Sequence, residues 1–354
     1  MKKKVVVGLS GGVDSSVAAL LLKEQGYEVI GVFMKNWEES NEQSECSSKQ
    51  DYEDVVSVCE TLKIPYFSLN FVQEYQDHVF SHFLEELKQG YTPNPDILCN
   101  REIKFKRFFQ KALELGANFL ATGHYAQTDH HHLLRSVDKE KDQTYFLYTL
   151  SSSILEKVLF PIGHLTKQEV RKIAEENGLI TAKKKDSTGI GFIGERKFSH
   201  FLKGYIAYQP GNFKTLKEEI VGKHQGVAYY TLGQRKGLGI GGKKGAKEEA
   251  WCVVKKDVKN NVVYVEQGED HPALYRNSLF AEELSWISGH APNFPFSCTC
   301  KIRYRQEDQE CCIEKEESGK IFVSFSKPQR AITPRQSIVF YTQEKCLGGG
   351  TICP

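Results

Sequence analysis

The stretch Gly8-Leu-Ser-Gly-Gly-Val-Asp-Ser-Ser16, written GLSGGVDSS, follows the apolar run KVVV and precedes the helically spaced segment VAALLLKEQG. The apolar run does not alternate, which is typical of a strand covered on both faces. The glycines and serines therefore lie between the carboxyl end of a buried strand and the amino end of a helix. Because the unpaired N–H groups and the dipole of such a helix attract anions, the stretch predicts a phosphate-binding loop in an α/β domain.

The residue types of this loop indicate which kind of phosphate site it is. Gly11 and Gly12 let the backbone close on a phosphate, while Ser10, Ser15 and Ser16 offer hydroxyl donors. No lysine follows, so the Walker pattern GxxxxGK[ST] is not matched. The loop resembles SGGxDSS, the pyrophosphate loop of enzymes that split ATP between its α and β phosphates and adenylate a substrate. A merely tight strand–helix turn is the alternative.

Length and composition narrow the class of protein. The 354 residues suffice for two or three domains, and a formal net charge of +2 means that any RNA contact must come from local basic patches. No apolar run reaches about 18 residues and Asp14 interrupts the apolar start, so we expect a cytoplasmic protein with no membrane contact. The ten cysteines include no CxxC pair and accompany no export signal, which argues against a disulfide framework and against zinc fingers.

Strand and helix patterns alternate up to about residue 200. Strands are expected at 28–34, 64–70 and 118–128, and helices at 50–62, 74–90, 101–116 and 170–178. Thr166 and Glu169 form a capping box before the last of these helices. The alternation predicts a doubly wound parallel sheet that binds its ligand at the carboxyl ends of the strands.

Beyond Tyr205 the composition and the hydrophobic pattern of the sequence change. Glycine and short alternating runs dominate, as in AWCVVKKDVKNNVVYVEQG and IFVSFS. We therefore expect three domains: a catalytic domain at 1–204, a small β-rich connector at 205–274 and a C-terminal β-barrel at 275–354. GLGIGG at 237–242 matches GxGxxG, but no helix pattern follows it, so a flexible loop is expected.

Two shorter patterns concern surface chemistry. HHH at 130–132 follows Asp129 and precedes a strand, so we interpret it as an exposed hairpin turn rather than a metal site. Arg303 and Arg305 alternate with apolar neighbours in KIRYR, which predicts that both basic side chains share one sheet face and meet phosphates. A solvated polar face is the alternative.

The stretch TPNPDILCNREIKF, residues 92–105, carries a candidate nucleophile. Asp96 and Cys99 flank the expected amino end of the helix that starts at Arg101. A thiol there gains thiolate character from the helix dipole and from Arg101 and Lys104, and Asp96 caps the helix or acts as a general base. A capping Asp beside an ordinary buried Cys is the alternative.

Landmarks along the whole chain share one resemblance. GLSGGVDSS, PNPDILCN, ATGHYA, KDQTYFLY, DSTGIGFIGERKF, TLGQRKGLGI, KIRYR and TPRQS, in that order, resemble the tRNA-specific 2-thiouridylase family. The resemblance implies an enzyme that uses ATP, as its Mg²⁺ complex, to adenylate the 2-oxygen of the wobble uridine and then replaces that oxygen with sulfur. The implied partners are tRNA and a persulfide-donating sulfur carrier or cysteine desulfurase.

The resemblance also assigns roles to individual residues. ATP would be held by Gly8, Leu9, Ser10, Gly11, Gly12, Val13, Asp14, Ser15, Met34 and Gly123. The flipped base would meet Asn94, Pro95 and Asp96, with Cys99 as the nucleophile, and the base must leave its stack to reach this pocket. The tRNA would be touched by His124, Lys141, Asp142, Gln143, Arg303, Tyr304 and Gln336.

One position departs from the family pattern. The family motif reads DSTGICFIGERKF, whereas this chain reads DSTGIGFIGERKF. Gly191 thus replaces the cysteine that carries the persulfide in the family. In the two-cysteine design one thiol carries the persulfide and the other resolves it, leaving an internal disulfide. With Gly191 that pair cannot form, so the route of sulfur delivery is open, whereas ATP binding, tRNA binding and adenylation are unaffected.

Two other readings of the sequence stay open. Amidating ligases and argininosuccinate-type synthases share the pyrophosphate loop, but they lack the Asp-x-x-Cys loop and need no RNA-facing barrel. An RNA-binding protein that kept the fold and lost catalysis would account for Gly191. Turnover of ATP to AMP that is stimulated by tRNA separates the last reading from an active enzyme.

Overall fold

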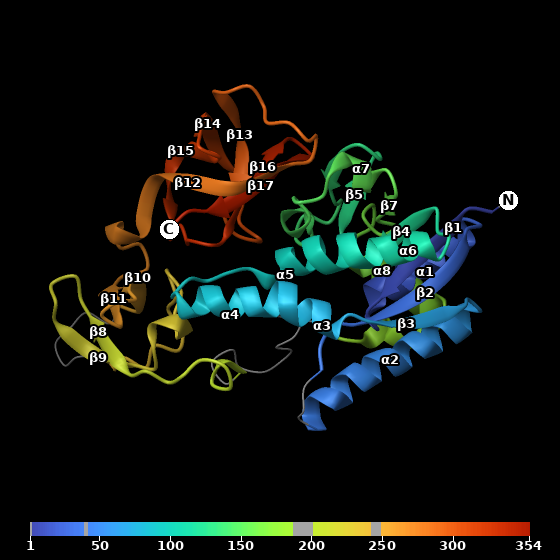
Figure 1. The fold of residues 1–354 in the computed structure, drawn as a ribbon, viewed down its shortest axis with the longest axis horizontal. Coiled ribbons are helices and arrows are strands. Elements are labelled where there is room, and N and C mark those ends of the chain that lie inside the picture. Colours follow the sequence, from blue (N-terminus) through green and yellow to red (C-terminus); the bar gives the residue numbers. More distant parts are fainter. Residues whose placement is uncertain (1, 39–41, 187–200, 242–248) are drawn as a thin grey trace.

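The computed structural model describes residues 2–38, 42–186, 201–241 and 249–354. Figure 1 shows a helix-covered sheet at the N-terminal end, a small β layer in the middle of the chain and a barrel at the C-terminal end. In the described part of the chain no helix is long and apolar enough to cross a membrane.

The N-terminal sheet is parallel throughout, as the alternation predicts. Its five strands, counted over the described residues, lie in the order β3 (Tyr66–Asn70), β2 (Glu28–Lys35), β1 (Lys4–Leu9), β4 (Phe119–Thr122) and β7 (Val158–Leu159). Val5 and Val7 of the central strand face one hydrophobic cluster and Val6 faces another. Both faces of the sheet are therefore covered, and the doubly wound fold is confirmed.

A different set of helices covers each face of the sheet (Figure 1). The face of Val5 packs on α1 (Val13–Glu24), α2 (Glu42–Leu62) and α8 (Lys167–Glu176). The opposite face packs on two long helices with π-helical segments inside them. The first runs through α3 (Val72–Tyr75), Gln76–Phe80 and α4 (Ser81–Lys88), and the second through α5 (Pro95–Leu98), Cys99–Phe108 and α6 (Phe109–Glu114). Shorter helical turns are Thr144–Phe146, α7 (Ser152–Leu155), Ile180–Lys183, Val227–Tyr229 and Pro272–Leu274.

The strand expected over 118–128 is in fact two strands in different sheets. β4 ends at Thr122, and β5 (Ala126–Thr128) pairs with β6 (Leu133–Arg135). A Cβ on Gly123 would lie 2.6 Å from the backbone nitrogen of Ser15, so the chain passes directly against the glycine-rich loop and turns there. β6 then pairs with β17 of the barrel, which joins this hairpin to the C-terminal sheet.

The middle of the chain forms a small β layer. Its four described strands lie in the order β10 (Trp251–Asp257), β11 (Val262–Gln267), β8 (Gly211–Lys214) and β9 (Ile220–His224). β10 and β11 form the hairpin expected from AWCVVKKDVKNNVVYVEQG. No helix follows the glycines of GLGIGG within the described residues, and Gly237 and Gly239 have φ of +79° and +66°.

The C-terminal strands close into a barrel. The six described strands are β12 (Tyr275–Trp286), β15 (Lys320–Arg330), β14 (Gln309–Glu317), β13 (Phe296–Lys301), β16 (Ser337–Thr342) and β17 (Lys345–Ile352), and β17 returns to pair with β12. Cys300, Ile313 and Phe340 lie in its core. Barrel closure leaves no free sheet edge among these strands.

Candidate active site

The glycine-rich loop has the geometry of a phosphate site. β1 ends at Leu9, α1 begins at Val13, and Gly12 at the N-cap receives no side-chain cap among the described residues. Gly11 has φ of +75°, and a Cβ there would lie 2.6 Å from the carbonyl oxygen of Asp51. Ser15 Oγ accepts the N–H of Ser10 at 3.2 Å. The first-turn N–H groups are therefore left for a ligand, as anion-binding helix termini require.

Two further residues assigned to ATP border the same end of the sheet. A Cβ on Gly8 would lie 3.7 Å from Met34 Cε and 3.0 Å from Phe108 Cε1. Gly123 sits against Ser15, as described above. The structure thus brings Gly8, Met34 and Gly123 to the carboxyl ends of β1, β2 and β4, respectively, where doubly wound sheets bind ligands.

Asp14 belongs to a charged network that sequence reasoning missed. Its carboxylate accepts the hydroxyl of Tyr125 at 2.8 Å and the ammonium of Lys167 at 2.7 and 2.9 Å. Lys167 also pairs with Asp186 at 2.8 Å, which in turn pairs with Lys141 at 2.7 Å. The sequence held only a partial signal, because Lys167 follows the capping residue Thr166 and Asp186 opens the DSTG stretch.

The helix that carries Cys99 begins earlier than expected. Asn94 is its N-cap, and the Asn94 side chain accepts the N–H of Asp96 at 3.1 Å. Cys99 therefore lies one turn inside a helix that continues to Glu114, not at a helix start. Burial raises the pKa of the Cys99 thiol to about 11, with Lys104 lowering it and Asp96 raising it. The capping role predicted for Asp96 is wrong because Asn94 caps the helix, and the thiolate character predicted for Cys99 is wrong because burial outweighs the effect of Lys104.

His124 is part of the interior. Thr122 Oγ1 lies 2.8 Å from its Nδ1, and Lys104 Nζ lies 3.4 Å from its Nε2. Phe105 and Phe160 contact its ring. Burial and the charge of Lys104 hold the pKa of His124 well below its usual value, so the imidazole is neutral. Within the described residues His124 links the end of β4 to the helix of Cys99, which places it behind the site rather than on the surface.

The segment 141–143 is also held by the protein. Asp142 is buried and accepts the N–H of Ser136 at 3.0 Å and the hydroxyl of Thr144 at 2.7 Å. The Gln143 amide oxygen accepts the N–H of Tyr125 at 2.9 Å. Of the three, Lys141 forms a partly buried ion pair, with Asp186. The three residues lie together next to the Asp14 network.

Arg303 does not lie on a strand face, so the predicted alternation is wrong. β13 ends at Lys301, and Arg305 has φ of +65°, which breaks the extended pattern. Arg303 instead donates to the carbonyl oxygen of Ala331 at 2.6 Å and that of Leu232 at 3.3 Å. It therefore joins the barrel to the middle layer.

Tyr304 and Gln336 connect the barrel to the N-terminal domain. The ring centroid of Tyr304 lies 4.4 Å from that of Phe146. The Gln336 amide donates to the carbonyl oxygen of Thr92, two residues before Asn94. The N-cap and first turn of α5, which carry Asn94, Pro95 and Asp96, are thus tied to the barrel through Thr92.

Two further predictions concern Gly191 and the HHH turn. Gly191 lies outside the described residues. HHH forms the exposed turn between β5 and β6 that was expected, with His132 Nδ1 2.8 Å from Asp129 Oδ2. Among the described residues no cluster of three or more potential metal ligands occurs.

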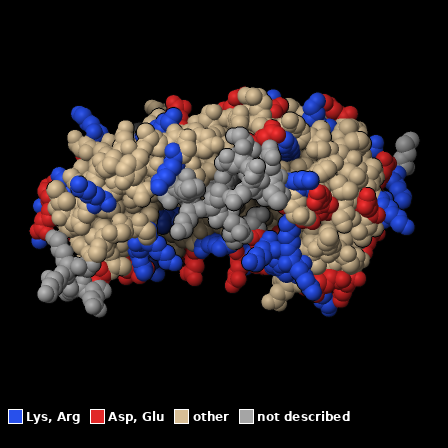
Figure 2. Space-filling view, turned by 90° about the horizontal axis from the view of Figure 1, so that it is seen from below, with Lys and Arg blue, Asp and Glu red and all other residues tan. Residues whose placement is uncertain are grey.

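Lysine and arginine side chains are unevenly distributed over one face of the molecule. Figure 2 views the molecule from below and shows the largest group of lysine and arginine side chains in the lower part of this face, with aspartate and glutamate beside it. Such local gathering, rather than the net charge of +2, is what an RNA surface requires.

The fold and the loop define a nucleotide-binding α/β domain followed by two β domains. Residues 3–195 match the model of the tRNA methyl transferase HUP domain, 199–267 that of the tRNA methyl transferase PRC-barrel domain, and 276–352 that of the aminomethyltransferase beta-barrel domain.

Curated relatives match the whole chain. A protein of Protochlamydia amoebophila (strain UWE25) is 60% identical, covering 99% of this chain and 93% of the relative. One of Alkaliphilus oremlandii (strain OhILAs) is 56% identical, covering 99% and 96%. Both are named tRNA-specific 2-thiouridylase MnmA. The chain belongs to the tRNA-specific 2-thiouridylase family.

Proposed function

We propose that this protein is a tRNA-uridine 2-sulfurtransferase that thiolates the wobble uridine of tRNA at the expense of ATP. The observation that carries the proposal is the convergence of two sites on one end of the sheet. The phosphate loop packs on Gly123, and the helix of Cys99 reaches the same strand end through the contact between Lys104 and His124. Relatives that share 60% and 56% of their residues with this chain carry the corresponding name.

The proposed reaction has two steps. The C2 oxygen of the flipped uridine attacks the α-phosphorus of ATP, and pyrophosphate leaves. A sulfur nucleophile then attacks C2 and AMP departs with the former oxygen atom, so that one C–O bond is replaced by one C–S bond. The open N–H groups around Gly12 would bind the phosphates. ATP would enter with Mg²⁺, and Asp14 is the carboxylate of the loop that would meet this cation.

The domains would divide this work. The catalytic domain at 1–204 would bind ATP and the base, while the connector at 205–274 and the barrel at 275–354 would hold the tRNA. Asn94, Pro95 and Asp96 would contact the flipped uridine, because their loop precedes Cys99 by one helical turn. Among the remaining tRNA candidates Lys141 has the most accessible charge, whereas Asp142 and His124 would act from inside the protein.

Cys99 would handle sulfur alone, since Gly191 leaves the chain without the family's second cysteine. The Cys99 thiolate would take the outer sulfur of a persulfide carrier, which leaves as a thiol, and this sulfur would attack C2 as AMP departs. An external thiol would then cleave the remaining S–S bond, and a second thiol would reduce the mixed disulfide left on Cys99. Free sulfide would instead attack C2 directly, with no bond to Cys99. Because Cys99 is buried and its pKa is about 11, donor or RNA binding must open or charge it first.

A combined assay tests the proposal. Purified protein, ATP and tRNA are incubated with a persulfide donor or, in a separate reaction, with sulfide and reductant, and both AMP and thiolated nucleoside are measured. We expect AMP formation that depends on tRNA, and thiolation from the persulfide donor that Cys99→Ser stops while AMP formation continues. After treatment with the persulfide donor and without reductant, mass spectrometry should find the extra sulfur on Cys99. Extra sulfur on another cysteine whose replacement also stops thiolation would refute the single-thiol route.

Gly191 favours one second candidate, an RNA-binding protein that kept the fold and lost catalysis. Such a protein would bind tRNA but produce neither AMP nor thiolated nucleoside with any donor. The same assay therefore separates the two functions without a further reagent.

A further inference from the structure

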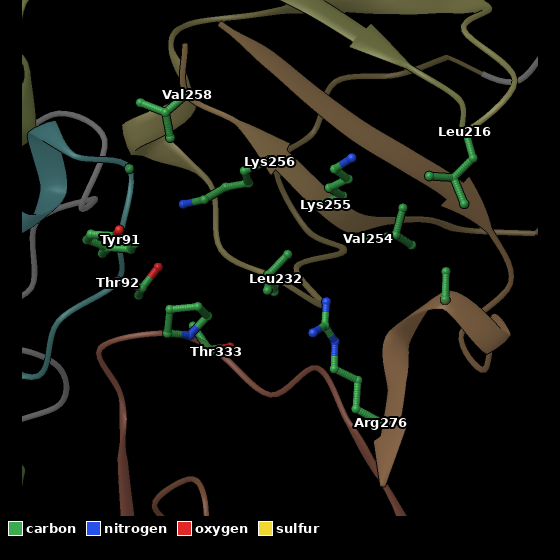
Figure 3. A pocket seen from close by; sticks show the side chains of 13 residues that line it. Tyr91, Thr92, Leu216, Leu232, Val254, Lys255, Lys256, Val258, Arg276 and Thr333 are labelled. Atoms are coloured by element: carbon green, nitrogen blue, oxygen red, sulfur yellow. The ribbon is translucent and has the colours of Figure 1, made fainter. Parts of the chain in front are cut away.

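A cavity of about 330 Å³ lies where the three parts of the chain meet. The loop 90–92 forms one wall, β10 and the turn after it form the second, and Arg276 of β12 with the barrel loop 333–334 forms the third. Figure 3 shows Lys256 reaching from its strand toward Tyr91 and Thr92, and Arg276 reaching toward Leu232. The volume is that of a small-molecule site and is enough for a single nucleotide.

Positive charge in this cavity is not neutralised. Of the three basic residues that line it, Lys255 has its ammonium 5.3 Å from the ring centroid of Tyr264 and interacts with Glu218. Lys256 and Arg276, by contrast, form no ion pair within the described residues. Arg335, on the barrel nearby, pairs with Glu86 at 2.9 Å and with Glu282 at 3.1 Å. The protein thus pairs its cations beside the cavity but leaves Lys256 and Arg276 for another partner, and the partner that fits is an anion.

Lys256 is the most telling of these cations. Its ammonium donates to the carbonyl oxygen of Tyr230 at 2.6 Å, and burial lowers its pKa to about 8. Burying a charged ammonium costs free energy unless an opposite charge binds beside it. A phosphate bound there would restore the charged form and offset that cost.

The remaining walls suit a flat apolar group. Leu232, Val254, Val258 and Pro334 line the cavity, with the ring of Tyr91 at its edge. Base–aromatic contacts of this kind are tolerant of sequence and are common in proteins that bind single-stranded nucleic acid. Apolar walls together with unpaired cations match the two halves of a nucleotide, its base and its phosphate.

Position decides which nucleotide this is. Thr92 lines the cavity and lies only two residues before Asn94, so the two sites are separated by at most about 7 Å of chain along the loop. The bond from Gln336 to the Thr92 carbonyl fixes this part of the loop against the barrel. We propose that the cavity receives the nucleotide adjacent to the target uridine in bound tRNA, with its phosphate on Lys256 and Arg276 and its base against Tyr91. This inference rests on the proposed function.

The test compares the affinity of tRNA for cavity and control variants over a range of salt concentrations. Lys256→Met and Arg276→Met should each weaken binding and lower the slope of log K against log salt by about 0.7, the value for one contact to single-stranded RNA. Lys223→Met, which removes a cation of strand β9 outside the cavity, should leave the slope unchanged. Lys256→Arg should retain binding, which separates loss of charge from damage to the fold.

A second arm identifies the occupant. An anticodon stem-loop with an abasic residue on one side of the target uridine should bind the native protein more weakly, and the difference should shrink in Tyr91→Ala. Free UMP serves as the probe for a separate mononucleotide site, and tight UMP binding with unchanged tRNA affinity in the cavity variants would overturn the inference. Equal salt slopes for Lys256→Met and Lys223→Met would do the same. If the native protein also made thiolated nucleoside, the proposed function would stand while this inference fell.

Discussion

At the scale of single residues, Asp14 links the phosphate loop to the ion pairs of Lys167 and Asp186. Its carboxylate holds Lys167, whose side chain is only 12% exposed, and Lys167 retains Asp186 as a second partner. Loss of Asp14 therefore leaves no buried cation without a counter-charge, and the fold should survive it. The phosphate loop, by contrast, loses its only carboxylate.

We predict that Asp14→Ala abolishes AMP formation in the presence of tRNA while tRNA still binds. AMP is measured by chromatography and tRNA affinity by fluorescence anisotropy. Asp77→Ala, which removes an exposed carboxylate in the helical segment 76–80, is the matched control and should behave as the native protein. Normal AMP production by Asp14→Ala would show that the loop does not bind the nucleotide.

The Cys99 thiol provides a prediction with a defined pH dependence. Its pKa of about 11 means that the protein without ligands holds it protonated at neutral pH, and alkylation requires the thiolate. The rate of iodoacetamide capture at Cys99 should therefore rise about tenfold per pH unit from pH 7 to 10, whereas that of free cysteine levels off near its pKa of about 8.5. Mass spectrometry of the peptide that contains Cys99 follows the reaction. A plateau by pH 8 would mean that the thiol is already ionised.

Several residue roles resisted sequence reasoning for an identifiable reason. Arg303 was assigned from local alternation and from the family resemblance, and His124 from the resemblance alone. Their actual partners, Ala331 for Arg303 and Lys104 for His124, lie 28 and 20 residues away along the chain. The types of residue in a site follow from its chemistry, but whether a polar side chain points inward depends on contacts that only the tertiary structure supplies.

At the scale of elements, local signals were reliable where they were short and complete. The Thr166 capping box is present as predicted, with the Thr166 side chain accepting the N–H of Glu169. The start of the Cys99 helix was missed although Asn94 and Pro95 form a regular pair of N-cap and first-turn residues. The split after β4 could not be predicted, because its cause is the contact of Gly123 with Ser15 more than a hundred positions away.

The capping box of α8 also makes a prediction about stability. Thr166→Ala should lower the free energy of unfolding by about 1 kcal/mol, since it leaves the first-turn N–H of Glu169 without its acceptor. Thr166→Ser keeps the hydroxyl and should lower it much less. Thermal melts of the two variants give the comparison, and equal melting temperatures would show that the box contributes nothing to the stability of this helix.

At the scale of the whole molecule, the type of each domain was predictable but the joints between them were not. Strand and helix patterns identify the parallel sheet, the hairpin of the middle layer and the barrel. The pairing of Leu134 with Lys345 joins strands more than two hundred residues apart, and Arg135 adds an ion pair to Asp308 at 2.6 Å. No local pattern encodes such a pairing, because either strand alone would also suit a free edge.

These joints determine how tRNA affinity should respond to mutation in the barrel. Gln336 ties the barrel to the Thr92 carbonyl, and so sets the position of the loop that is expected to hold the flipped base. We predict that Gln336→Ala weakens tRNA binding and leaves ATP binding unchanged, because the phosphate loop lies at the ends of other strands. Gln343→Ala, in the exposed turn between β16 and β17, removes the same amide without the tie and is the control. Anisotropy titrations with tRNA and equilibrium binding of ATP measure the two affinities. Equal tRNA affinity in both variants would mean that the barrel does not position the base-binding loop, and that its contribution to recognition is electrostatic attraction alone.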